Sequence, residues 1–160
     1  MFIICDNKNQ EKIRNYFLSR FGIEKIFFEK YLFYKKNKSL FIITKERKEQ
    51  INKIISKNQI RSMGIELFCN LKETVPSSIG ISAIFKADQI KTNYLMLDRK
   101  QAIDFFENKE ININDISKKQ VLSSGYVIGI HNQKIIGTLY FDKEKNICKP
   151  NISFENNNIK

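Results

Sequence analysis

Residues 93–142 read NYLMLDRKQAIDFFENKEININDISKKQVLSSGYVIGIHNQKIIGTLYFD, and this segment holds the most informative pattern in the chain. A short apolar run at 94–97 predicts a strand, and a helical pattern follows it. After a long polar loop, two apolar runs at 125–130 and 135–141 are joined by the polar tetrapeptide 131–134, which predicts a β-hairpin. This order of strand, helix, loop and hairpin favours a small half-open β-barrel that carries one helix.

The helix of this segment carries its own start signal. Asp98 is placed as the N-cap, and Gln101 three residues later completes the D-x-x-Q form of a capping box. Ala102, Phe105 and Phe106 recur at spacings of three and four, so they predict one apolar face. The helix is therefore expected to begin directly after Asp98 and to pack through these three side chains.

The same residues resemble a known family. Residues 97–111, LDRKQAIDFFENKEI, follow the pattern acidic-x-x-x-Ala-x-x-(Phe/Leu)-(Leu/Phe)-x-Gly-x-(Asp/Glu)-(Ile/Leu/Val), and the hairpin carries Gly125-Tyr126-Val127 and Ile136-Gly137. These features resemble the PUA domain, an RNA-binding module attached to RNA-modifying and ribosome-assembly proteins. Asn108 stands where that family prefers Gly, and Asn is the usual substitute at a left-handed position. The resemblance covers roughly the last 65 residues.

The first half of the chain predicts a mixed α/β unit. A strand at 2–5 leads to a helix capped by Asp6 or Asn7 and stopped by Gly22. That helix presents one apolar face, formed by Ile13, Tyr16, Phe17 and Phe21. Strands at 30–34 and 40–43 are joined by the polar turn 35–39, and Thr44 is expected to cap a second helix.

The expected inner face of this second helix consists of Ile51, Ile54 and Ile55. A further strand is predicted at 63–70. Residues 72–80, KETVPSSIG, have the composition of a loop. Residues 81–91 are ambiguous, and they fit a strand that leads into a helical turn.

The two halves together resemble a more specific group, the small two-domain archaeal proteins related to the eukaryotic nucleolar factor for large-subunit ribosome biogenesis. The residues that carry this resemblance are the strand after Gly64, the segment 85–90, and Lys145, Asn146, Lys149 and Pro150 after the hairpin. The terminal arginines of that family's basic segment are missing. The expected organisation is an α+β fold, with an N-terminal α/β domain built on an antiparallel sheet at 1–92 and a PUA-like half-open β-barrel at 93–160.

This resemblance implies a non-catalytic cytoplasmic protein of rRNA processing and ribosome biogenesis. Its PUA domain would bind rRNA, with a preference for U-rich or A/U-rich sequence, and its N-terminal domain would contact other assembly factors. The same tandem also occurs at the ends of rRNA cytosine methyltransferases. A role as an accessory subunit of an rRNA methyltransferase or pseudouridine synthase therefore stays open.

The net charge of +11 agrees with a nucleic-acid partner but has a second explanation. Ile, Asn and Lys supply 67 of the 160 residues, a bias typical of an AT-rich genome, and only five of the 28 basic residues are Arg. Residues 1–92 hold 18 Lys and Arg against 9 Asp and Glu, whereas residues 93–160 hold 10 against 8. A protein-interaction adaptor whose charge is genomic bias is thus a third possibility, and it predicts no salt-dependent RNA binding.

Catalytic chemistry finds little support in the sequence. His131 is the one histidine, and its place in the hairpin turn favours a solvated residue over a general base. Cys5, Cys69 and Cys148 form no CxxC pair, so a reducing cytosol and core packing fit better than zinc or disulfides. No phosphate-binding glycine motif is present, and no cofactor is expected. The N-terminal apolar run is short and lacks a basic region, and no segment has the roughly 18 apolar residues of a membrane span.

Nine basic side chains are the candidates for RNA contact. They lie in the first turn of the predicted helix, in the loop before the hairpin, and on or beyond the hairpin: Arg99, Lys100, Lys109, Lys118, Lys119, Lys134, Lys143, Lys145 and Lys149. Each would pair with phosphate and release counterions, which makes binding salt-dependent. Tyr126 and Tyr140 are candidates for stacking on bases, although core packing explains them better.

Overall fold

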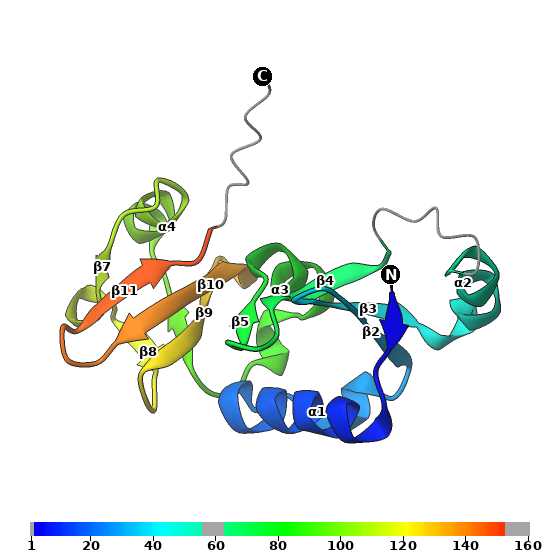
Figure 1. Ribbon diagram of the computed structural model, residues 1–160. Helices are drawn as coiled ribbons and strands as arrows, with labels where there is room; N and C mark the ends of the chain where they lie inside the picture. Colours follow the sequence, from blue (N-terminus) through cyan, green and yellow to red (C-terminus); the bar gives the residue numbers. More distant parts are fainter. Residues whose placement is uncertain (1, 56–62, 153–160) are drawn as a thin grey trace.

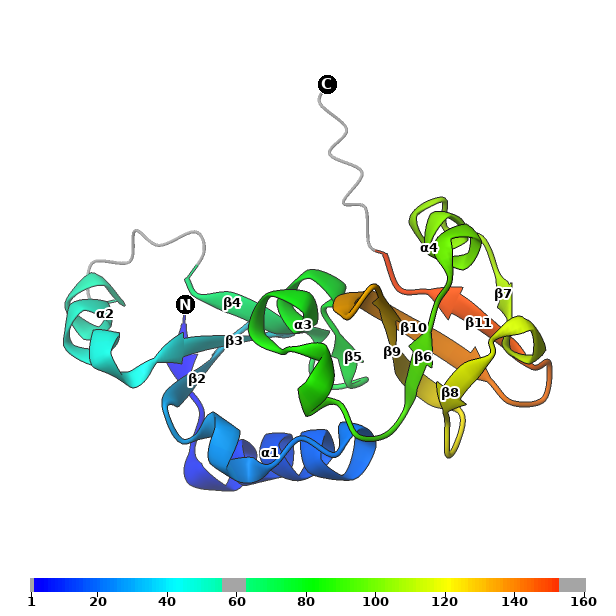
Figure 2. The same ribbon diagram turned by 180° about the vertical axis from the view of Figure 1, so that it is seen from behind.

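The computed structural model describes residues 2–55 and 63–152, and its strands form two sheets (Figures 1 and 2). The first sheet has five strands in the order of the chain, and every neighbouring pair is antiparallel. Its strands are β1 (Ile3–Ile4), β2 (Tyr31–Lys36), β3 (Ser39–Thr44), β4 (Ile65–Asn70) and β5 (Val75–Pro76). This confirms the antiparallel sheet predicted for the N-terminal half.

The second sheet has the order β7-β11-β10-β9-β6-β8 and curls into a half-barrel (Figure 1). Its strands are β6 (Tyr94–Met96), β7 (Ile111–Asn112), β8 (Lys118–Gln120), β9 (Gly125–His131), β10 (Lys134–Asp142) and β11 (Ile147–Pro150). The pairs are antiparallel except β6 with β9, which run parallel. The α+β class is confirmed.

Helices accompany both sheets. The α-helices are α1 (Asn7–Phe21), α2 (Lys48–Ile55), α3 (Ser78–Ile84) and α4 (Arg99–Phe106). Short 3-10 turns are η1 (Lys25–Phe28), η2 (Lys45–Arg47), η3 (Ala87–Gln89) and η4 (Ile113–Asp115). In Figure 2, α3 lies between the two sheets and α1 runs along the first sheet toward the second.

The ends of α1 and α4 follow from the predicted caps. Asp6 accepts a hydrogen bond from the Asn9 backbone N–H at 2.7 Å, and Gly22 ends α1 with φ 69°. Asp98 and Gln101 form the reciprocal capping box at the start of α4. Asn108, two residues beyond α4, has the predicted positive φ of 58°.

One side chain of α4 departs from the predicted apolar face. Ala102 and Phe105 are buried, but Phe106 is 60% exposed. Successive helical residues point about 100° apart, so Phe105 occupies the inward direction and Phe106 turns to solvent. The prediction of a three-residue face was therefore wrong at Phe106.

The β9–β10 hairpin is tighter than the tetrapeptide 131–134 predicted. His131 and Lys134 pair with each other, so the turn contains only Asn132 and Gln133. Both turn residues have positive φ, 47° and 62°, which is the backbone of a two-residue turn that matches the twist of the strands. His131 therefore belongs to a strand.

The segment 72–91 differs most from its prediction. The expected loop contains β5 and the start of α3, and the expected strand after residue 81 is the rest of α3 followed by η3. Ser77 caps α3 by accepting from the Gly80 backbone N–H at 3.2 Å. The signal for this helix is a single serine cap, and the turn-forming composition around it conceals the helix.

The start of the second helix was also predicted wrongly. Thr44 precedes η2, its side chain makes no capping bond, and α2 begins only at Lys48. The expected inner face of that helix, formed by Ile51, Ile54 and Ile55, lies outside the described side chains.

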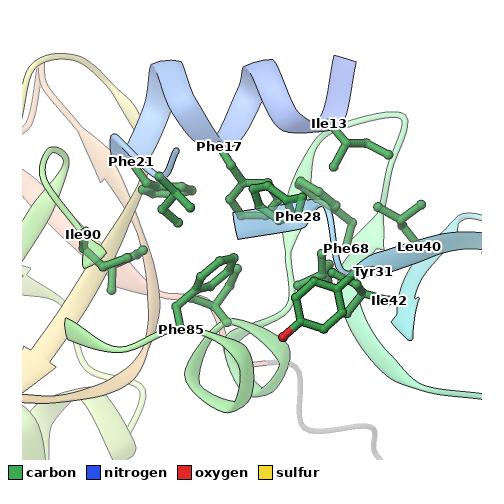
Figure 3. Close-up of a cluster of buried hydrophobic side chains, with 14 of the residues drawn as sticks. Ile13, Phe17, Phe21, Phe28, Tyr31, Leu40, Ile42, Phe68, Phe85 and Ile90 are labelled. Atoms are coloured by element: carbon green, nitrogen blue, oxygen red, sulfur yellow. The ribbon is translucent and has the colours of Figure 1, made fainter. Parts of the chain in front are cut away.

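One hydrophobic cluster, called the shared core from here on, contains residues of both sheets, and the second sheet has a further core of its own. The predicted face of α1 is correct, since Ile13, Phe17 and Phe21 are buried and Tyr16 packs against them. Figure 3 shows Ile13, Phe17 and Phe21 pointing from α1 into the cluster that contains Phe28, Phe68 and Phe85. The same cluster includes three residues of the second sheet, Ile128, Ile130 and Ile135. The predicted boundary at 92/93 separates the strands of the two sheets, but this core crosses it.

Arg20 connects α1 to the second sheet through side-chain hydrogen bonds. Its Nε donates to the Tyr126 backbone oxygen at 2.7 Å, and its two Nη atoms donate to the Ser123 hydroxyl and backbone oxygen at 2.7 and 3.1 Å. The Arg20 backbone oxygen accepts from the Asn93 side-chain amide at 2.6 Å. The guanidinium group therefore holds a loop that lies more than a hundred positions away along the chain.

An Arg20→Ala variant should lose roughly 1–3 kcal/mol of unfolding free energy, because it removes three charged hydrogen bonds, one of them to the partly buried backbone oxygen of Tyr126. Arg20→Lys should recover only part of the loss, since an ammonium lacks the planar fork. Urea unfolding monitored by circular dichroism measures both. If Arg20→Ala unfolded at the same urea concentration as wild type, the hydrogen bonds of the Arg20 guanidinium group would add nothing to stability.

Candidate nucleic-acid interface

A groove of about 710 Å³ opens where α3 and η3 meet the second sheet. We call it the inter-sheet groove, and its lining residues are Ser82, Phe85, Lys86, Ala87, Asp88, Ile90, Tyr94, Met96, Lys118, Ile130, Gln133, Lys134 and Ile135. The first half of the chain supplies the wall from Ser82 to Ile90. The second half supplies the opposite wall from β6, β8, β9 and the start of β10.

Strand register explains why two of the predicted lysines meet in this groove. Met96, the last residue of β6, pairs with Lys118 at the start of β8 and with Ile130 near the end of β9. Lys134 begins β10 opposite His131. The parallel pairing of β6 with β9 thus brings the first residues of β8 and β10 to one end of the sheet.

Arg99 and Lys100 belong to the same end of the second sheet. They are exposed residues in the first turn of α4, which directly follows β6. The Leu97 backbone N–H donates to the Ile130 oxygen at 2.7 Å and holds this connection against β9. Four of the nine predicted residues are therefore clustered here, although Arg99 and Lys100 do not line the groove itself.

The groove combines an apolar floor with a cationic rim. Phe85, Ile90, Ile130 and Ile135 are buried, and together with half-buried Tyr94 and Met96 they form the floor. The exposed rim holds Lys86, Lys118 and Lys134 together with the carboxylate of Asp88. Three positive charges against one negative charge leave the rim positive, and the apolar walls concentrate the field of this net charge, which favours an anionic ligand.

The three rim lysines keep their ammonium groups available. Among residues 2–55 and 63–152, no carboxylate lies within 4.0 Å of Lys86, Lys118 or Lys134. Sequence reasoning missed Lys86 because it lies in the other half of the chain. The tertiary contact of η3 with the second sheet brings it to the rim, and no local pattern signals that contact.

Three other predicted contacts form ion pairs with neighbouring carboxylates. Lys109 pairs with Glu107, Lys145 with Asp142 at 3.6 Å, and Lys149 with Glu110 at 2.7 Å. The hydrogen bonds with Glu107 and Glu110 raise the pKa of Lys109 and Lys149 above the ordinary lysine value. These side chains are exposed, but their charge is locally balanced, and they do not line the groove.

The last two candidates also lie away from the groove. Lys119 was expected in a loop but belongs to β8, and its ammonium donates to the backbone oxygens of Ile113 and Ile116 at 2.7 and 2.9 Å. Because these bonds close the turn η4, Lys119 has a structural role. Lys143 lies beyond β10 and, with Lys119, lines a separate hollow of about 500 Å³.

Tyr126 and Tyr140 form a cross-strand pair on β9 and β10, with ring centroids 5.4 Å apart in a T-shaped arrangement. Tyr126 packs against the shared core, whereas Tyr140 is 45% exposed. Neither ring lines the inter-sheet groove. Two aromatic residues line the groove, buried Phe85 and half-buried Tyr94, and sequence analysis placed Tyr94 only in a strand.

The histidine and two of the cysteines, which sequence analysis weighed as catalytic candidates, lie in structural environments. The His131 ring contacts the Leu97 backbone oxygen through Nδ1 at 2.8 Å, so it is held against the start of α4 and is not a solvated turn residue. Burial raises the pKa of the Cys148 thiol to about 12 and that of Cys5 above its ordinary value. Both thiols are therefore protonated at neutral pH.

Within 2–55 and 63–152 no cluster of three or more His, Cys, Asp or Glu side chains is arranged to hold a metal ion. Over the same ranges no helix combines the length and apolarity needed to cross a membrane. Neither a scan of protein families nor a search of curated proteins found a match to this chain.

Proposed function

We propose that this chain is a non-catalytic RNA-binding protein that acts in rRNA processing and large-subunit ribosome biogenesis. The observation that carries the proposal is the inter-sheet groove, with the ammonium groups of Lys86, Lys118 and Lys134 on its rim and one carboxylate among them. Phosphate is the anion that lysines without a carboxylate partner among residues 2–55 and 63–152 would bind by charge. Arg99 and Lys100 extend the positive surface beyond the end of β6.

The biological role rests on the resemblance of the sequence to PUA-domain proteins of ribosome assembly. The second sheet with α4 has a layout that suits a PUA-like domain: a curled mixed sheet, a capped helix after its first strand, and the hairpin β9–β10. The RNA would be rRNA with U-rich or A/U-rich sequence. The N-terminal half would then contribute Lys86, which lies between α3 and η3, to the RNA surface and would contact other assembly factors.

Binding to RNA is expected to weaken steeply with salt. A fluorescence polarisation titration of a U-rich single strand and of an rRNA fragment, at about 50 and about 200 mM salt, measures this, since each phosphate contact on a single strand contributes about −0.7 to the slope of log K against log salt. Replacing Lys86, Lys118 and Lys134 together by Gln should lower affinity at least tenfold and make the slope shallower by about 2.

The matched control replaces Lys109, Lys145 and Lys149 by Gln. It removes the same three charges from lysines that are already paired with carboxylates. This variant should bind RNA within about threefold of wild type at the higher salt, where long-range attraction is screened. Equal losses in both variants would place the contact elsewhere, and no RNA binding at low salt would favour the adaptor over the RNA-binding protein.

A further inference from the structure

We propose that the inter-sheet groove holds an unpaired base of single-stranded RNA, with the strand's phosphates on the lysine rim. This inference rests on the proposed function and adds the class of RNA and the place of contact. The site is composite, because Phe85 and Lys86 come from the first half of the chain and Tyr94, Lys118 and Lys134 come from the second.

The first argument is the apolar floor. A surface that binds only phosphates needs charge alone, yet Tyr94 and Met96, both half-buried, line this groove together with the lysines. One side of each residue packs against the shared core, and the other lines the groove. An aromatic ring next to cations is the combination that stacks on bases while it follows a nucleic-acid backbone.

The second argument is size. A volume of about 710 Å³ lies inside the range of roughly 300–1,000 Å³ that is usual for small-molecule sites, so it admits a base with its sugar. A duplex is far wider and presents only the edges of its bases. A base reaches an apolar floor with its face only after it leaves the stack, and this requirement selects single strands, loops and bulges.

The third argument is the polar groups among the lining residues. Asp88 accepts hydrogen bonds and therefore suits the amino group of a base rather than a phosphate. Gln133, in the two-residue turn of the β9–β10 hairpin, carries an amide that both donates and accepts. Groups of this kind recognise the edges of a base, whereas the lysines recognise phosphate in any sequence.

The shared core and the hydrogen bonds of Arg20 hold the two walls of the groove together in the absence of a ligand. Phe85 packs against Phe17 in that core, with ring centroids 5.4 Å apart, and Ile130 and Ile135 belong to the same cluster. Both walls of the groove are thus parts of one packed body, and a base enters a site that is already shaped for it.

Three RNA probes with equal numbers of phosphates per strand test this inference by fluorescence polarisation: a ten-nucleotide A/U single strand, an abasic strand of the same length, and the matching duplex. The single strand should bind at least tenfold more tightly than the other two. Tyr94→Leu should lose about tenfold in affinity for the single strand and leave the abasic strand unaffected, whereas Tyr94→Phe should retain wild-type affinity because the ring remains.

The outcomes separate this inference from the proposed function. If no probe binds at low salt, RNA binding itself fails. If the abasic strand or the duplex binds as tightly as the base-bearing strand in a salt-dependent manner, RNA binding stands and the base pocket is wrong. Uridine or adenosine monophosphate that binds as tightly as the ten-mer would also overturn it, in favour of a free nucleotide. Circular dichroism of both Tyr94 variants is the control that separates a loss of affinity from a loss of folded protein.

Discussion

Gly80→Ala is expected to lower the free energy of unfolding by more than about 3 kcal/mol, although alanine is the better helix former. Gly80 lies in α3, where a Cβ atom would fall 1.7 Å from the backbone oxygen of Glu66 on β4. A backbone atom inside a sheet cannot move aside as a flexible side chain would. The helix would have to lift from the sheet and separate Ile81, which is fully buried, from the core.

Urea unfolding compares this variant with Ser82→Ala, a change at an exposed position of the same helix. The Ser82 hydroxyl donates only to the Ile79 backbone oxygen of its own helix, at 2.9 Å. Ser82→Ala should therefore be neutral or slightly stabilising, because it mainly changes helix propensity. A shared midpoint for the two variants would show that α3 tolerates a methyl group at Gly80 and that its contact with β4 is looser than the structure describes.

Phe17→Ala is expected to destabilise the fold by about 3–5 kcal/mol, the usual cost of emptying a buried aromatic site. Phe17 is fully buried, and its ring lies 5.2 Å from Phe28 and 5.4 Å from both Phe68 and Phe85 between ring centroids. These neighbours come from η1, β4 and the segment after α3. Removal of the ring therefore leaves a cavity that rigid elements on several sides prevent from closing.

Phe106→Ala is the control for this change. It deletes the same ring from a helix surface where the side chain is 60% exposed, and it should alter stability by no more than about 0.5 kcal/mol. Both variants are measured by urea unfolding with the same probe. If Phe17→Ala cost as little as Phe106→Ala, the aromatic cluster would not be the centre of the core.

The elements that were predicted correctly depend on local chemistry. The caps of α1 and α4 need only Asp6, Gly22 and the pair Asp98 and Gln101, all within three or four residues of the backbone groups that they satisfy or the helix end that they define. The left-handed residue Asn108 is equally local. Such features are visible in sequence because the interacting groups are neighbours along the chain.

The missed elements depend on distant contacts. Helix α3 contains a glycine that its contact with β4 requires, and this glycine made the segment resemble a loop. Strand β8 consists of Lys118, Lys119 and Gln120, an exposed run without apolar alternation, and it is a strand only because it pairs with β6. Periodicity gives no signal for an edge strand of this kind.

In the candidate site, too, the features set by local sequence were predicted and those set by distant contacts were missed. Sequence composition identified lysines of the second half but could not separate Lys118 and Lys134 from Lys109, Lys145 and Lys149, because the carboxylate partners are set by folding. Lys86 and Tyr94 became part of the proposed interface only when the two sheets were placed side by side. Whether the groove binds RNA stays a prediction for the titrations above.

The core that crosses the two sheets also has a consequence for the order of folding during synthesis. The N-terminal strands and α1 leave the ribosome before β9 and β10, yet Ile128, Ile130 and Ile135 of those late strands complete their core. Until the hairpin arrives, the nascent chain exposes part of its aromatic cluster and is open to chaperones and to aggregation. Once the hairpin docks, the first sheet gains the apolar partners that complete the shared core, so its unfolding should be coupled to that of the second sheet.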